Sequence, residues 1–516
     1  MFKKIVSIIM AMAILLSLIG CGESASEVKS SLSAEITSKA IDEFISITKV
    51  PRPSYHLEHI LEYLINFAKE HSFDYARDDY GNFWMDVPAS SGYENAPKVI
   101  LQGHMDMVCA AESDYDIDFE NTGLNAKVDG NTITADKTSL GADDGIGVGI
   151  ILAMVTSDAP HGPIRALITA DEDVGLLGAQ QLPAEALDAD YLINIDHEKP
   201  MEIVYSSAGN LRWEATKEYG TKAQADGSEI IKISISGLQG GHSGLEINKN
   251  RLSANTVIKD LFNATKNEGI DFEIGSINGG TAQNAIAPQG EVIIAVPKEK
   301  SSKVKEISDK LISDYHSNYP DEKLEINVST EDVKCSNFIS NKDSLELLEV
   351  ISSLPQGVLA MSQKNEGLVQ TSANTGIIFV ENGKCKIGQS TRSCVTKDME
   401  DLRLKSDTML KEKGYVCKIE ADYPGWDGDA DVSLVKLIKE GYEKSDSGEA
   451  AVIPIHAGLE CSWFSRKREG IQMVSIGPRV DNAHTVQETL YIDTIEPCVK
   501  TVLYALKNIE SFTMGK

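Results

Sequence analysis

The spacing of apolar residues along the chain predicts helices and strands that alternate. Residues 36–71 carry apolar side chains at helical spacing, interrupted at Pro51 and Pro53, so we expect two helices joined by a turn. Short apolar runs follow, separated by helix-like segments such as 146–155; these runs are residues 98–101, 164–169 and 191–195. Strands that alternate with helices predict an α/β fold whose central sheet is mostly parallel.

The pattern changes near residue 210. Longer strands with alternating apolar and polar residues, such as 230–235, and polar helices continue to about residue 418, and the run 474–478 then again predicts a buried strand. A chain of 516 residues is also too long for one ordinary hydrophobic core. We therefore expect one domain made of residues 35–209 and 421–516, interrupted by an inserted α+β domain at residues 210–420.

The N-terminal residues predict export. Residues 1–20 begin with two lysines and continue with an apolar run, which is typical of a signal peptide, and residues 18–21 have the form of a lipobox. We expect diacylglycerol on Cys21, a flexible tether over 21–34, and an extracytoplasmic protein anchored by lipid to a bacterial membrane. An uncleaved anchor or an ordinary signal are the alternatives, although the apolar run is shorter than the roughly 20 residues of a membrane span.

The composition and the absence of several motifs argue against some classes of function. The formal net charge of −29 disfavours nucleic acid as a partner. The eight cysteines include no Cys-x-x-Cys pair, so we expect no zinc–thiolate site. The chain also contains no His-Glu-x-x-His, Gly-x-Ser-x-Gly or Gly-x(4)-Gly-Lys-Ser/Thr motif, which argues against three common classes of hydrolase and nucleotide-binding site.

Potential metal ligands follow the apolar runs directly. His104 and Asp106 are two residues apart on a predicted strand and therefore project from the same face. Further acids stand at 143–144, 171–173 and 196, next to other apolar runs. Ligands of α/β sheets collect beyond the carboxyl ends of the strands, so we expect these residues to converge. Imidazoles with several carboxylates, one of them bridging and one free to act as a base, suit a pair of divalent ions.

Five motifs occur in an order that resembles a known family. They are Gly-His-Met-Asp at 103–106, Leu-Gly-Ala-Asp-Asp-Gly-Ile-Gly at 140–147, Asp-Glu-Asp-x-Gly at 171–175, Ile-Asn-Ile-Asp at 193–196 and Gly-Pro-x(5)-His at 477–484. Further matches lie at 50–55, 279–286, 423–426 and 455–461. The series resembles the bacterial aminoacyl-histidine (Xaa-His) dipeptidases, in the co-catalytic dizinc peptidase superfamily that includes carnosinases. The resemblance makes the inserted domain a lid and the rest the catalytic domain.

The resemblance implies a site with two divalent metal ions, expected to be zinc with cobalt or manganese as alternatives. The first ion would be bound by His104, Asp143 and Asp196, and the second by Asp143, Asp173 and His484. Asp106 would hold the imidazole of His104 in its metal-binding tautomer. Glu172 would be the general base, taking a proton from a water that bridges the ions and passing it to the leaving amine.

The same resemblance implies dipeptide substrates and their contacts. His242 would donate to the oxyanion, from the lid of the same chain or of a partner's chain. Arg392, supplemented by Asn284, would bind the substrate's C-terminal carboxylate. His456 and Glu460 would shape the pocket, with Glu460 near the free amine. The family often forms homodimers, and here two chains would pair through the lid domain.

The sequence departs from the family pattern at two positions. Asp173 stands where the family has Glu, so this ligand is one methylene shorter, and Asp144 stands where it has Asn. The shorter arm leaves the metal preference open. Two other functions also stay open: an N-acyl-amino-acid acylase or deacetylase of the same fold, and a non-catalytic peptide-binding lipoprotein, against which Glu172 argues.

Overall fold

The computed structural model describes residues 31–514, apart from residues 245, 332, 364–366 and 446–447. The predicted signal segment, Cys21 and almost all of the tether lie outside the described residues. In the described part, no helix combines the length and apolar character that a membrane crossing needs.

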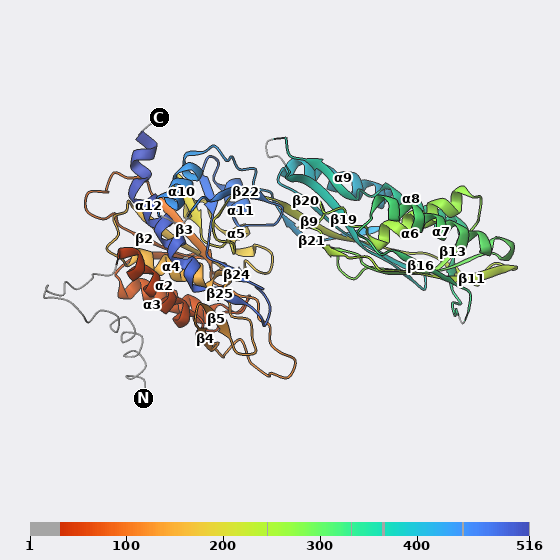
Figure 1. Cartoon of the computed structure of the whole chain (residues 1–516), viewed down its shortest axis with the longest axis horizontal. Helices are drawn as coiled ribbons and strands as arrows, with labels where there is room; N and C mark the ends of the chain where they lie inside the picture. The colour runs from red at the N-terminus through yellow and green to blue at the C-terminus, as the bar shows by residue number, and fades with distance from the viewer. Residues whose placement is uncertain (1–30, 245, 332, 364–366, 446–447, 515–516) are drawn as a thin grey trace, which may run out of the picture.

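The two largest sheets of the described residues lie at opposite ends of an elongated molecule (Figure 1). The first has eight strands in the order β1-β2-β6-β3-β7-β23-β8-β22. Its central strands β6, β3, β7 and β23 run parallel, whereas β1 and β2 add antiparallel pairs at one edge. The predicted α/β fold with central parallel strands is confirmed. The strands are β1 (Asp74–Arg77), β2 (Phe83–Val87), β3 (Val99–His104), β6 (Ile164–Thr169), β7 (Tyr191–Asn194), β8 (Glu202–Ser207), β22 (Ala451–Ile455) and β23 (Gln472–Ser475).

Helices cover both faces of this sheet. Alternate residues of each strand point to opposite faces, so Leu101 joins the core under the long helices while Ile100 joins the smaller core on the other face. The long helices are α2 (Leu32–Ile47), α3 (Glu58–Glu70), α4 (Ala142–Val155), α10 (Ser433–Lys444) and α12 (Ile495–Met514). The other face carries α5 (Leu177–Gln181), η2 (Ala184–Leu187) and α11 (Cys461–Lys467).

Helix α4 lies in the middle of the domain that contains the first sheet, between α2 and β3. Every residue from Asp144 to Val155 is buried, as expected for a helix that is apolar on all sides. Its glycines allow this close packing, since a Cβ atom at Gly149 would come within 2.7 Å of the carbonyl oxygen of Ala40 on α2. Helix α4 therefore packs closely against α2.

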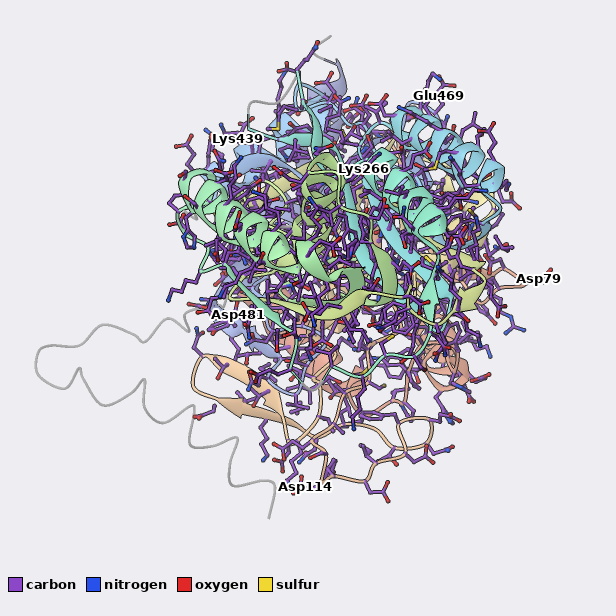
Figure 2. The ribbon with its side chains drawn as sticks, turned by 90° about the vertical axis from the view of Figure 1, so that its right-hand side faces the viewer. Asp79, Asp114, Lys266, Lys439, Glu469 and Asp481 are labelled. Atoms are coloured by element: carbon purple, nitrogen blue, oxygen red, sulfur yellow. The ribbon has the colours of Figure 1, made fainter. Side chains whose placement is uncertain are left out.

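The second sheet is antiparallel, in the order β16-β11-β15-β13-β19-β20-β9-β21, with β18 added beside β19. Its strands are β9 (Gly209–Glu218), β11 (Ser228–Ser236), β13 (Glu273–Gly279), β15 (Gly290–Pro297), β16 (Glu325–Ser329), β18 (Gly357–Met361), β19 (Val369–Glu381), β20 (Lys384–Ser393) and β21 (Val416–Tyr423). Helices lie along one side of it, as the end-on view of Figure 2 shows. They are α6 (Ala254–Asn267), α7 (Ser301–Asn318), α8 (Asn341–Ser353) and α9 (Thr396–Glu412).

The chain enters and leaves the second sheet on neighbouring strands. β9 begins at Gly209 and pairs with β21, which ends at Tyr423. The two connections between the sheets therefore lie side by side. We keep residues 210–420 as our proposed bounds for the lid domain.

Short elements complete the fold. Strands β4 (Ala126–Asp129), β5 (Thr132–Ala135), β24 (Val480–Asp481) and β25 (Thr489–Tyr491) form a small sheet that joins the C-terminal part of the chain to the N-terminal part. The remaining elements are β10 (Thr221–Lys222), β12 (Gly241–His242), β14 (Ala285–Ile286), β17 (Phe338–Ile339), η3 (Lys298–Lys300) and η4 (Ile492–Thr494).

Candidate metal centre

The predicted ligands meet at the carboxyl edge of the first sheet. His104 is the last residue of β3, Asp173 follows β6, and Asp196 follows β7. Asp143 stands at the start of α4, and His484 lies in the loop between β24 and β25. Five segments that are far apart in the sequence thus bring one side chain each to the same place.

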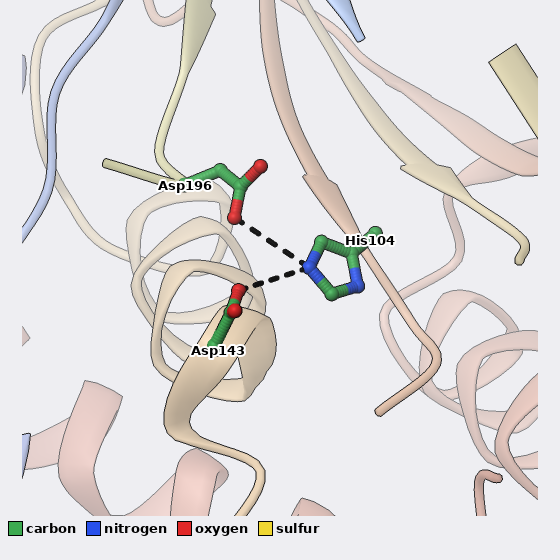
Figure 3. Close-up of side chains that lie close together, drawn as sticks. All are labelled: His104, Asp143 and Asp196. Atoms are coloured by element: carbon green, nitrogen blue, oxygen red, sulfur yellow. Dashed lines mark hydrogen bonds and ion pairs between the residues drawn. The ribbon is translucent and has the colours of Figure 1, made fainter. Parts of the chain in front are cut away.

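These side chains form two groups that share Asp143. His104 Nε2 lies 3.1 Å from Asp143 Oδ1 and 3.5 Å from Asp196 Oδ1 (Figure 3). His484 Nε2 lies 2.9 Å from Asp143 Oδ2 and 2.9 Å from Asp173 Oδ1. In each group the potential ligand atoms lie within 4.8 Å of one another. Asp143 therefore presents one carboxylate oxygen to each group, which is the arrangement that a bridging ligand needs.

The donor set fits divalent cations. Burial raises the pKa of Glu172 and Asp173 above the usual range and that of Asp196 to about 7. Asp173 Oδ2 is buried and accepts no hydrogen bond from the described residues. Buried carboxylates need compensating charge, and within the described residues His104 and His484 are the two imidazoles paired with this group. Two divalent ions would supply the missing positive charge.

Asp106 connects His104 to the base candidate. Its side chain is buried, and its Oδ1 lies 3.4 Å from His104 Nδ1 and accepts the backbone N–H of Glu172 at 2.9 Å. Its Oδ2 accepts from the Ser54 hydroxyl at 2.8 Å and from the N–H of Asp173 at 3.2 Å. Glu172 Oε2 lies 4.0 Å from His104 Nε2, beside the first group. One carboxylate thus fixes the positions of an imidazole and of two acids.

Asp144 lies between the end of β3 and the start of α4. Its side chain is buried and accepts the backbone N–H groups of His104 at 3.2 Å and of Gly147 at 3.1 Å. Burial, followed by the charge of Asp196, raises its pKa. The acid at this departure from the family pattern therefore ties β3 to the start of α4.

Three of the predicted substrate contacts form a second cluster. His456 Nε2 lies 2.8 Å from the Ser372 hydroxyl on β19. A Cβ atom at Gly244 would lie 2.9 Å from the His456 carbonyl oxygen, 3.0 Å from His242 Cε1 and 3.1 Å from Arg392 Cζ. Burial and then the charge of Arg392 lower the pKa of His242, and lower that of His456 to about 4. Both shifts favour the neutral form of the imidazole.

Asn284 lies on the edge of the same cluster. The backbone carbonyl oxygen of Asn284 accepts the backbone N–H of Ser243 at 2.9 Å. Strand β14, which begins at the next residue, pairs with β12 at His242.

The position of Glu460 differs from the predicted contact with the substrate's free amine. Its side chain is fully buried, and its Oε2 accepts from Gln102 Nε2 at 2.6 Å and from the Thr169 hydroxyl at 2.7 Å. Gln102 also accepts from Asn194 Nδ2 at 2.7 Å. Glu460 thus connects β3 and β6 directly, and β7 through Gln102. This position favours a role in positioning the strand ends over contact with a substrate amine.

Among the charged residues at the site that sequence reasoning missed are Glu198 and Arg52. Glu198 follows Asp196 by two residues, and burial together with the charges of Asp143 and Asp196 raises its pKa to about 8. Arg52 is buried, and its guanidinium donates to the carbonyl oxygens of Met105, Asp106 and Gly141. The motif match at 50–55 could have singled out Arg52. The carbonyl groups to which it donates come from other segments, which only the folded chain brings next to it.

Comparison with known proteins gives consistent matches. Residues 100–508 match the model of peptidase family M20/M25/M40. The chain is 32% identical over 462 residues to the cytosol non-specific dipeptidase of Escherichia coli (strain K12), covering 88% of this chain and 94% of that protein. The crystal structure of the aminoacylhistidine dipeptidase from Vibrio alginolyticus superimposes with a TM-score of 0.84 at 31% identity, covering 93% of this chain and 98% of that chain. A tripeptidase from Staphylococcus aureus shares the fold, with a TM-score of 0.53 at 18% identity over 92% of this chain and 99% of that chain.

The comparison corrects one expectation. The Escherichia coli relative is named a cytosol dipeptidase. This finding contradicts the predicted extracytoplasmic, lipid-anchored location, for which the sequence pattern around Cys21 was the argument. The N-terminal pattern is a motif match, and a motif match is a hypothesis that a full-length relative can overturn.

Proposed function

The chain belongs to peptidase family M20/M25/M40, and we propose that it is a metal-dependent dipeptidase that hydrolyses unblocked dipeptides, Xaa-His among them. The observation that carries the proposal is Asp143, whose two carboxylate oxygens each face a different imidazole, with Glu172 beside them. The likeness to two dipeptidases over more than nine-tenths of their length supports the choice of substrate.

Five side chains would hold the metals: His104, Asp143 and Asp196 the first ion, and Asp143, Asp173 and His484 the second. We propose zinc, with cobalt or manganese as alternatives, because imidazole and carboxylate ligands suit all three. Two such ions would polarise the scissile carbonyl and lower the pKa of water.

Glu172 would transfer the proton. Its backbone N–H donates to Asp106, and its carboxylate lies 4.0 Å from His104 Nε2, next to the first ligand group. It would accept a proton from the attacking water and deliver it to the leaving amine. Asp106 would serve by fixing both Glu172 and His104.

The lid would bind the C-terminal carboxylate and the developing oxyanion of the reacting peptide. Arg392 is buried and permanently charged, so it would pair with the C-terminal carboxylate, with Asn284 beside it. The surroundings of His242 lower its pKa and so favour the neutral imidazole, which would donate one N–H to the developing oxyanion. His456, which contacts Ser372 of the lid, would shape the pocket. We propose that His242 acts from the chain's own lid or from a partner's lid in a homodimer, in which two chains would pair through the lid domain.

The replacement Glu172→Gln tests the mechanism. We expect a loss of hydrolysis of at least about 100-fold, since proton transfer by a positioned side chain contributes about 10²- to 10⁴-fold. The ion content should stay at two per chain, because Glu172 is absent from both proposed ligand sets. The assay uses β-Ala-His, Gly-His and Leu-Gly with zinc, cobalt or manganese, and Glu70→Gln, at an exposed position on α3, is the matched control.

Other outcomes would replace the proposal. Hydrolysis of N-acetyl amino acids without hydrolysis of dipeptides would make the protein an acylase or deacetylase. Calorimetric binding of dipeptides without turnover under every metal would make it a binding protein. Full activity of the Glu172→Gln protein would contradict the role of Glu172.

A further inference from the structure

Glu488 forms a buried contact next to the metal centre, although it belongs to neither ligand group. Its side chain is 2% exposed, and its carboxylate accepts four consecutive backbone N–H groups. Oε2 accepts from Leu140 at 2.8 Å and from Gly141 at 2.9 Å, and Oε1 accepts from Ala142 at 2.7 Å and from Asp143 at 3.2 Å. Consecutive N–H groups that point to one place form an anion-binding concavity, and here a side chain of the same protein fills it.

The two segments joined by Glu488 each carry a ligand of the second group. Asp143 is the last of the four N–H donors, and His484 precedes Glu488 by four residues in the loop between β24 and β25. That loop is short and internally bonded, since the Thr485 carbonyl accepts the Glu488 N–H at 3.2 Å and the Thr485 hydroxyl donates to the Asn482 carbonyl at 2.8 Å. The position of Glu488 therefore sets the position of His484 relative to Asp143.

The chemistry of the contact requires a carboxylate. Each oxygen of Glu488 accepts two N–H groups, so a side-chain amide would turn one acceptor into a donor that faces two donors. Arg52 balances the buried charge from the other side of the same loop, where it donates to the Gly141 carbonyl. Gly141 has a φ of +67°, a left-handed conformation that orients its N–H toward Glu488 and its carbonyl toward Arg52.

We propose that Glu488 is a positioning residue that fixes the separation of Asp143 and His484 and thereby sets the affinity of the second metal site. The inference rests on the proposed function only in that Asp143, Asp173 and His484 bind a metal ion. Replacement of groups that orient metal ligands typically lowers metal affinity by about 10- to 100-fold, and we expect a loss of this size at the second site and a smaller loss at the first.

The test measures metal binding directly. Wild type, Glu488→Gln and Glu488→Asp are stripped with a chelator, titrated with Zn²⁺ alone in a calorimeter, and then dialysed and analysed for zinc content. We expect about two ions per chain in wild type and about one in Glu488→Gln. Glu488→Asp keeps the carboxylate on a shorter arm, so its second-site affinity should lie between the two. In activity assays at saturating zinc, kcat of Glu488→Gln should recover toward wild type while KM stays unchanged.

Glu322 offers a matched control in the lid domain. It is also a buried glutamate that accepts backbone N–H groups, from Gln239 at 2.8 Å and from Leu252 at 3.1 Å. Glu322→Gln should lower stability and leave both zinc affinities unchanged. If Glu488→Gln does not fold, the second-site Zn²⁺ affinity of Glu488→Asp, measured in the same titration, tests the inference.

Unchanged second-site affinity in the folded Glu488 variant would overturn the inference while leaving the proposed function intact. Wild type that binds no zinc and hydrolyses no dipeptide would instead overturn the proposed function.

Discussion

Asp143 is the residue on which the account depends. One of its oxygens lies 3.1 Å from the imidazole of His104 and the other lies 2.9 Å from that of His484. The hydrogen bonds and charges of the two histidines outweigh the effect of burial and hold the pKa of Asp143 well below its usual value. A carboxylate that stays ionised between two imidazoles can bind an ion on each side.

Asp173 shows how a shorter side chain can serve the same site. Its backbone N–H is fixed by Asp106, and its Oδ1 already reaches to 2.9 Å from His484 Nε2. Two ligand atoms on one tetrahedral zinc ion, each about 2.0–2.2 Å from it, lie about 3.3–3.6 Å apart, so Asp173 already comes close enough to His484 to share an ion with it. The shorter arm therefore needs no extra methylene in this chain.

The replacement Asp173→Glu should weaken the second site, although it restores the usual family residue. The extra methylene must fit into a space where the side chain is 1% exposed, and overpacking of this kind costs about 1–3 kcal/mol. We expect Zn²⁺ affinity at the site with His484 to fall by about tenfold, measured by calorimetric titration. Tighter Zn²⁺ binding in the Asp173→Glu protein would contradict the prediction and show that the aspartate is too short for the second site.

At the scale of the elements, the sequence predicted the residues that follow strands. His104, Asp173 and Asp196 were placed by the rule that ligands collect at the carboxyl ends of parallel strands, and the structure brings them together there. The pairs of ligands, the base and the lid contacts came from the resemblance to a family, because spacing alone does not say which side chains share an ion.

The contacts that join distant segments could not be predicted from the sequence. Glu488 meets residues 140–143, Glu460 meets Gln102 and Thr169, and Arg52 meets the carbonyl of Gly141. Each is a polar side chain in a loop or at a helix start whose partner lies on another segment. Hydrophobic periodicity carries no information about such pairs, so they appear only in the folded chain.

At the scale of the whole molecule, two domains meet at a narrow junction. The chain crosses between them beside the paired strands β9 and β21, and His456, which follows β22 of the first sheet, contacts Ser372 on β19 of the second sheet. Because His456 is buried beside Arg392, its protonation would place two positive charges together at this junction.

Acid should therefore destabilise the protein through His456. Its pKa is about 4 in the folded chain and about 6.5 when unfolded, so the unfolded chain takes up the proton first as the pH falls. The contribution to the free energy of unfolding is complete above about pH 6.5 and declines toward pH 4, by about 2 kcal/mol at pH 5. In urea denaturation with a chelator, His456→Gln should lose about that much less stability than wild type between pH 7 and pH 5.

The exposed His316 on α7 provides the control for this measurement. His316→Gln should follow wild type at every pH. An equal loss of stability in His456→Gln and in wild type would show that His456 does not have the depressed pKa on which the prediction depends.

Anomalous diffraction at the zinc edge, from crystals grown with Zn²⁺, tests the central claim most directly. The account predicts two peaks on either side of Asp143, each about 2.0–2.2 Å from one of its carboxylate oxygens. One peak should also contact His104 and Asp196, and the other Asp173 and His484. A single peak, or peaks that do not share Asp143, would contradict the two-metal site.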